Sequence, residues 1–241
     1  MVPADPYAWS WNPEALVLVP LLTIAYAWAL RREGERTPRW RIACWVAAML
    51  LVWAVTITPV ETISLQYLLS VHLIQNVVLA EWAPLLAVLG IPAALAARVP
   101  RVHPLAALLV WVVNYGVWHL PWVYDAALRH PHTLLHLEHA MYFLTGLALW
   151  WPVVHGALSP GAKAAYVFAA FLLASPIGLM MALVPEPIYA FYEDAPRLWG
   201  LSPILDQQIA GVAMAAAEAV VFFAVFALFF VRFLREQDAG T

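Results

Sequence analysis

The sequence predicts an all-α fold, a polytopic bundle of seven transmembrane helices. Composition is the first reason: 64% of the 241 residues are hydrophobic and only 11% are charged. Soluble domains are about 45–50% apolar and about 25% charged. The second reason is that the apolar residues form runs of roughly 20, the length that crosses about 30 Å of hydrocarbon as a helix. A water-soluble globule is therefore excluded.

Seven such runs divide the chain. They are too long, and alternate too rarely, for the strands of a membrane barrel. Short connections join them, so residues 1–241 are expected to form a single transmembrane domain. The predicted spans lie near residues 13–30, 41–59, 63–89, 104–119, 132–152, 163–183 and 204–231.

Basic residues set the predicted orientation. With seven spans, only Arg129 and Arg197 fall on one side of the membrane. The other basic residues fall on the opposite side: Arg31, Arg32, Arg36, Arg39, Arg41, Arg98, Arg101, Lys163, Arg232 and Arg235. Because basic loops stay in the cytoplasm, the N-terminus is predicted outside and the C-terminus in the cytoplasm.

Charge and cysteine content exclude further classes of function. The formal net charge is −3, and the basic residues are confined to short loops, so no nucleic-acid partner is expected. Cys44 is the single cysteine of the chain, which excludes a disulfide framework, a CxxC redox pair and a thiolate-rich metal site.

Histidines collect toward the predicted outer side. His132, His136 and His139 fall within an arc of roughly 60° on one helix face. His72 and His119 reach similar depths on other spans, so a shared pocket is geometrically feasible. Imidazole is a ligand for copper, zinc, iron and nickel. The structural alternative is that these side chains join helices by hydrogen bonds.

Other buried polar residues have two readings each. Asn76 shares a helix face with His72, either as part of a ligand set or as an interhelical hydrogen-bond patch. Glu81 and Glu218 are predicted deeper in the membrane, where they serve either a proton path or structural hydrogen bonds. Small residues near Gly211 predict a close helix–helix approach.

Four motifs, in this order along the chain, resemble the CtaG-type cytochrome c oxidase assembly factors. Together they cover most of residues 64–215. They are Ser70–Asn76 with Ala83–Pro92, then Trp118–Pro121 with Tyr124–Asp125, then His136–His139 running on to Trp150–Pro152, and finally Asp206–Gly211.

The resemblance implies a non-enzymatic metallochaperone of the respiratory chain in a bacterial plasma (inner) membrane. Such a protein would supply copper, at the outer half of the membrane, to the oxidase catalytic subunit, with a periplasmic copper donor as a further partner and lipid around it. The implied copper ligands are His72, His119, His136 and His139, and the additional ligands or orienting groups are Asp125, Asp206, His132 and Asn76. Asn76 stands where the family pattern often has a second histidine, and an amide is a poor copper ligand.

Two other functions fit the same residues. Seven spans with histidines and aspartates also resemble the intramembrane zinc hydrolases of the ceramidase and adiponectin-receptor group, in which zinc activates a water molecule. Those sites face the cytoplasmic half, where this chain has only His103 and His155. The other alternative is a metal or proton transporter using Glu81 and Glu218, although the sequence has no inverted repeat.

Overall fold

The computed structural model describes residues 4–33 and 36–239, and every regular element within these ranges is a helix. Residues 1–3, 34–35 and 240–241 of the predicted domain lie outside the described residues. The elements are α1 (Pro13–Glu33), α2 (Arg39–Ile57), α3 (Pro59–Gln66), α4 (Leu69–Val77), the π-helix η1 (Val78–Trp82), α5 (Ala83–Gly90), α6 (Ala93–Ala96), α7 (Pro104–Trp118), α8 (Pro121–Arg129), the π-helix η2 (Pro131–Leu135), α9 (His136–Val154), α10 (Pro160–Leu183), α11 (Ala190–Glu193) and α12 (Pro203–Ala239).

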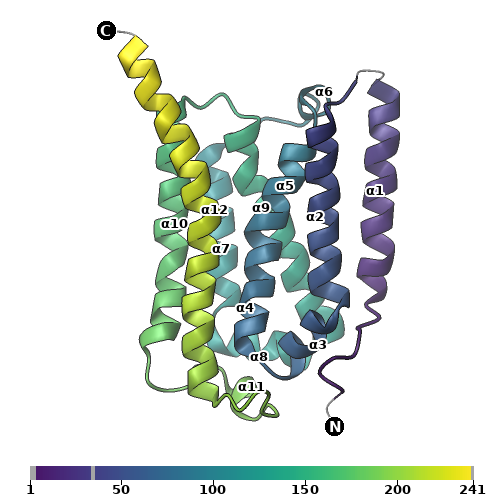
Figure 1. Cartoon of the computed structure of the whole chain (residues 1–241), viewed down its shortest axis with the longest axis vertical. Coiled ribbons are helices and arrows are strands. Elements are labelled where there is room, and N and C mark those ends of the chain that lie inside the picture. The colour runs from purple at the N-terminus through teal and green to yellow at the C-terminus, as the bar shows by residue number, and fades with distance from the viewer. Residues whose placement is uncertain (1–3, 34–35, 240–241) are drawn as a thin grey trace.

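The long helices run side by side in one bundle (Figure 1). The pair α10 and α12 forms one edge, α1 forms the other, and α4, α5 and α9 lie between them. The described chain begins and ends at opposite ends of the bundle. The connections α3, α8 and α11 gather at the end where the chain begins. His72 near the start of α4, His119 after α7 and His139 in the first turn of α9 lie toward this end.

Five helical segments of the described chain are long and apolar enough to cross a membrane, and the bent pair of α7 and α8 makes a sixth if it counts as one span. The five are residues 15–33, 39–57, 69–90, 160–183 and 203–239. The predicted span 132–152 corresponds to α9, which is not among them. Its first turn carries His136, Glu138 and His139, and these polar residues lower its hydropathy.

Two predicted boundaries differ from the structure. The predicted span 63–89 is interrupted, because α3 ends at Gln66 and α4 begins at Leu69. The segment after the predicted span 104–119 is not an open loop, because it forms α8, which is bent 73° from α7. Pro121 occupies the first position of α8. Proline lacks an N–H, and at this position an N–H would have no acceptor within the helix, so no hydrogen bond is lost.

Glycines allow the closest helix contacts. A Cβ atom at Gly178 of α10 would lie 2.9 Å from the backbone oxygen of Gly211 in α12, so the two backbones touch. The close approach predicted from the small residues near Gly211 is confirmed. In the same way, a Cβ at Gly146 of α9 would meet Ala80 and Pro84 of the central segment.

The central helix changes to a π-turn at η1, just before Pro84. Proline has no N–H, so the carbonyl of Ala80 one turn earlier lacks its helical donor. The indole of Trp111 donates to that oxygen at 3.3 Å, and the indole of Trp150 donates to the oxygen of Glu81 at 2.9 Å. Both tryptophans are fully buried, so side chains from α7 and α9 stabilise this irregular backbone.

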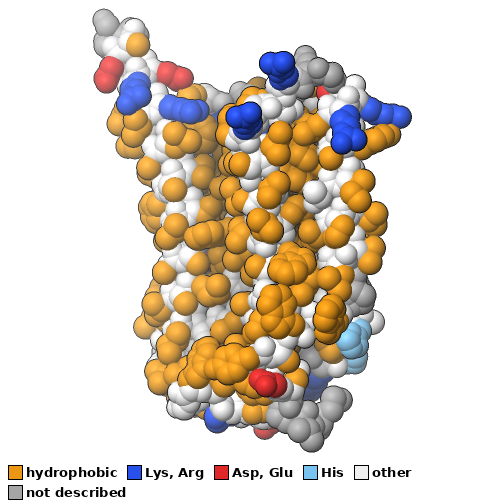
Figure 2. Space-filling view, turned by 45° about the vertical axis from the view of Figure 1, so that its right-hand side comes forward, with side chains coloured by type: hydrophobic (Ala, Val, Ile, Leu, Met, Phe, Trp, Pro, Cys, Tyr) orange, Lys and Arg blue, Asp and Glu red, His pale blue; other side chains and the backbone are white. Residues whose placement is uncertain are grey.

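The surface has a broad apolar belt with charge at its two ends (Figure 2). Most Lys and Arg side chains visible in that view lie at the end where α1 and α12 end. Exposed Leu, Val and Phe side chains cover the helices between the two ends. An apolar belt between two charged ends is the surface expected of a protein that spans a lipid bilayer.

Candidate metal centre

Three of the four predicted histidine ligands converge in the bundle. His72 lies on α4, His119 follows the last residue of α7, and His139 lies on α9. The ring centroids of His72 and His139 are 6.2 Å apart, with the rings almost perpendicular. The ring of Tyr124 lies 5.1 Å from His72 and 6.2 Å from His119. These three histidines, which we call the histidine cluster, are all buried.

Hydrogen bonds determine which nitrogen of two rings carries the proton. The Tyr192 hydroxyl donates to the backbone oxygen of Ser64 at 2.5 Å, so it accepts the bond from His72 Nδ1 at 2.8 Å. His119 Nδ1 lies 2.8 Å from the backbone oxygen of Tyr115, which can only accept. Both rings therefore carry the proton on Nδ1 and present the lone pair of Nε2.

No described group satisfies those lone pairs. Nε2 of His72, of His119 and of His139 are all buried, and none has a hydrogen-bond partner within residues 4–33 and 36–239. An unpaired buried polar atom costs about 1–3 kcal/mol, so the two free lone pairs of His72 and His119 and the unpaired Nε2 of His139 make this region a candidate ligand site. In the described part of the chain, no three His, Cys, Asp or Glu side chains are grouped closely enough to hold a metal ion.

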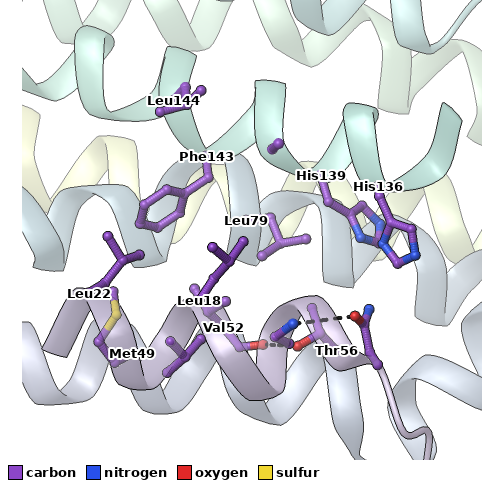
Figure 3. Close-up of a pocket in the computed structure, with 14 residues that line it drawn as sticks. Leu18, Leu22, Met49, Val52, Thr56, Leu79, His136, His139, Phe143 and Leu144 are labelled. Atoms are coloured by element: carbon purple, nitrogen blue, oxygen red, sulfur yellow. Dashed lines mark hydrogen bonds between the residues drawn. The ribbon is translucent and has the colours of Figure 1, made fainter. Parts of the chain in front are cut away.

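His136 adjoins His139 at the edge of the cluster, and His132 lies beyond it. The rings of His132 and His136 are 6.2 Å apart, and His132 is exposed. His136 and His139 lie side by side at one end of an apolar pocket of about 340 Å³ between α1, α2 and α9 (Figure 3). Leu18, Leu22 and Phe143 line the rest of that pocket, so the cluster borders a cavity at the lipid-facing side of the bundle.

Asp206 holds the helix that carries His72. Its carboxylate accepts from the backbone N–H of Leu69 at 2.7 Å and of Ser70 at 3.2 Å, and from the Ser70 hydroxyl at 2.5 Å. These are the free donors at the start of α4, so α12 supplies an N-cap to a helix 136 residues earlier. Asp206 thus orients His72 through the backbone.

Asp125 of α8, like Asp206, has a carboxylate that accepts a hydrogen bond from the backbone of another helix. It accepts from the backbone N–H of Phe191 at 3.1 Å and thereby holds α11, which carries Tyr192. Burial raises the pKa of the Tyr192 phenol well above its usual value, and nearby acidic groups raise it further. The phenol consequently stays protonated and keeps its bonds to Ser64 and His72.

Asn76 lies one turn beyond His72 and faces a different partner. Its side-chain amide donates to Glu138 Oε1 at 3.3 Å, which connects α4 to α9 beside the cluster. Glu138 is fully buried, and its other oxygen has no hydrogen-bond partner in the described residues. Of the two readings of Asn76, the structure shows the interhelical hydrogen bond.

Sequence reasoning assigned no role to the tyrosines around the cluster. Tyr189 donates to the backbone oxygen of His119 at 3.0 Å and stacks on Tyr124 at 4.1 Å. Tyr192 orients His72. The available signal was the aromatic stretch at residues 188–192, which lies outside every predicted span.

These features define a helical membrane protein with a buried cluster of oriented histidines. The family model of the cytochrome c oxidase caa3 assembly factor (Caa3_CtaG) matches residues 24–236. The chain therefore belongs to this family, as the four motifs predicted. It matches no curated protein and no solved structure.

Proposed function

We propose that the chain delivers copper to the catalytic subunit of cytochrome c oxidase during assembly. Membership of the family supports the role in oxidase assembly and suggests a non-catalytic protein that interacts with the oxidase. The observation that carries the copper proposal is the set of three buried, unpaired Nε2 atoms of His72, His119 and His139.

The preorganised rings favour a metal over a simple hydrogen-bond patch. Metal-binding histidines usually donate their second N–H to a carbonyl or another oxygen, which fixes the tautomer and the ring orientation. His119 does so to a backbone oxygen, and His72 does so to a phenol that is itself fixed. Imidazole accepts copper as well as zinc, so zinc is the alternative ion.

We further propose seven crossings of a bacterial plasma membrane, with α9 as the additional one. It has 19 residues and runs among the other long helices. An odd number of crossings agrees with chain ends at opposite ends of the bundle. The basic end would then face the cytoplasm, and the histidine cluster would face a periplasmic copper donor.

Metal content of the purified protein tests this function. After loading with copper under reducing conditions and removal of excess metal, we expect about one copper ion per chain. The double variant His72→Ala/His139→Ala should lose it, whereas His136→Ala should retain it. His130→Ala is the matched control, because His130 is exposed and its Nδ1 contacts the backbone oxygen of Ala126 in the preceding helix α8. Equal copper in the double variant and the wild type would refute the site.

A further inference from the structure

A second buried polar centre lies deeper in the bundle, where Glu81 of η1 and Glu218 of α12 approach each other. Both side chains are fully buried. The neighbouring residues are in contact, since the indole of Trp82 donates to the backbone oxygen of Ala217 at 3.2 Å. The two carboxyl groups are close enough to interact electrostatically. We call Glu81 and Glu218 the carboxyl pair.

The carboxyl pair has one hydrogen-bond donor for four oxygens. Tyr115 of α7 donates to Glu218 Oε1 at 2.6 Å. Glu218 Oε2 and both oxygens of Glu81 have no partner among the described residues. Around them pack the neutral side chains Trp111, Trp150 and Phe222, which contact one another.

None of the interactions found among the described residues brings a basic side chain to the carboxyl pair to neutralise a negative charge there. The salt bridge between Arg98 and Glu33 lies near the basic end of the bundle. The titratable groups nearest the pair are Tyr115 and, against its ring, His119 of the cluster and Tyr142 of α9. Two unpaired carboxylates in such surroundings would cost several kcal/mol each, so the pair must hold a proton.

Tyr115 connects the carboxyl pair to the histidine cluster. Its hydroxyl contacts Glu218, its ring lies 4.6 Å from the ring of His119, and its backbone oxygen accepts from His119 Nδ1. Glu81 lies in a π-turn, an irregularity that often marks functional positions in helices. A positive charge added at the histidine cluster therefore favours the ionised form of the carboxyl pair, because the buried region between them screens charge poorly.

We propose that the carboxyl pair is an exchangeable proton site, which holds a proton in the metal-free protein and releases it when a metal cation binds the histidine cluster. The metal part of this inference rests on the proposed function. The charges balance: one monovalent cation enters, one proton leaves for solvent, and the net charge of the carboxyl pair falls by one unit. The rings of His72 and His119 contribute no proton, because their Nε2 atoms are already unprotonated.

Infrared spectroscopy tests the proton site without metal. In metal-free protein at neutral pH, the carbonyl band of a protonated carboxylic acid should be present. The intensity of this band should be lower in Glu81→Gln or Glu218→Gln than in the wild type. The intensity left in the double variant should equal that of the single variant with the weaker band. Tyr115→Phe, which removes one donor, should shift the band. An unchanged band in the double variant would overturn the proposal.

Calorimetry of copper binding in two buffers with different ionisation enthalpies then counts released protons. We expect about one proton per copper in the wild type and none in the double variant Glu81→Gln/Glu218→Gln. Glu138→Gln is the matched control, because Glu138 is also buried and adjoins His139 but lies outside the pair. Loss of release in that control instead, or copper binding by the wild type without release, would refute the coupling. Failure of the wild type to bind copper would refute the proposed function, while the infrared band would still decide the proton site.

Discussion

The first residues of α4 and His72 just beyond them differ in how completely their buried polar groups are hydrogen-bonded. At Leu69 and Ser70, every donor at the helix start is bonded to Asp206. Just beyond, His72 has one ring nitrogen fixed by Tyr192 and the other left without a partner. A satisfied buried group stabilises the fold, whereas an oriented but unsatisfied group is prepared for a ligand. The difference separates the structural carboxylate of Asp206 from the histidines that we propose as metal ligands.

Removing the satisfied group should have the largest effect on stability. Asp206→Ala leaves the N–H groups of Leu69 and Ser70 buried without an acceptor. We expect a loss of about 3 kcal/mol in the free energy of unfolding, measured by titration with a denaturing detergent. Asp206→Asn, which keeps one oxygen, should lose about half as much. Asp125→Ala is the comparison, since Asp125 accepts a single bond. A loss for Asp206→Ala no greater than for Asp125→Ala would remove the distinction.

Disturbing the orientation of His72 should weaken metal binding more than it weakens folding. Tyr192→Phe removes the hydroxyl that fixes the ring and leaves the Nε2 lone pair in place. We expect copper affinity to fall by about 10–100-fold, measured by competition with a chelator. Tyr7→Phe is the control, because Tyr7 is an exposed tyrosine that contacts Trp199. Unchanged affinity in Tyr192→Phe would mean that the ring needs no fixed partner.

Glu61 of α3 adds a pH-dependent case beside the same helix. Gln75 of α4 donates to its carboxyl group, but burial is the larger influence and raises the pKa of Glu61 from 4.5 to about 8. The folded state then binds a proton that the unfolded state has lost. Stability should therefore be highest below about pH 4.5 and fall as the pH rises toward about 8, by roughly 1 kcal/mol per pH unit. Glu61→Gln should flatten this slope in detergent unfolding measured at several pH values. An identical slope in the variant would assign it to other groups.

Removing an unsatisfied group should have the smallest effect on stability. His139→Phe replaces a ring whose Nε2 is buried and unpaired with an apolar ring of similar shape. We expect the free energy of unfolding to change by less than about 1 kcal/mol, or to increase, while copper binding is lost. A destabilisation as large as that of Asp206→Ala would show that His139 has a structural role.

The long helices and the positions of the histidines along them could be predicted because hydrophobic length and helical spacing are local properties. The similar depths of these histidines made a shared pocket feasible, but the sequence could not show that the helices of His72 and His139 are neighbours. Asp206 was predicted as an additional ligand or an orienting group, but its bonds to the backbone of α4 could not be predicted, because they depend on a break at Tyr67–Leu68 that exposes the donors of a distant helix. Tyr192 was missed for a similar reason: α11 is short and meets His72 only through the tertiary fold.

The polar start of α9 shows the limit of hydropathy. The residues that keep α9 from the set of apolar spans, His136, Glu138 and His139, are those that border the cluster and its pocket. A helix that carries a buried polar site resembles a surface helix in composition. Its place in the bundle depends on neighbours such as Asn76, which a single span does not reveal.

X-ray absorption spectroscopy of the copper-loaded protein tests the central claim most directly. If the oriented rings of His72, His119 and His139 bind the ion, the copper environment should consist of imidazole nitrogens. One fewer should be found after His72→Ala, with no change after His130→Ala. Sulfur neighbours, or a spectrum that is the same in His72→Ala and the wild type, would contradict the account.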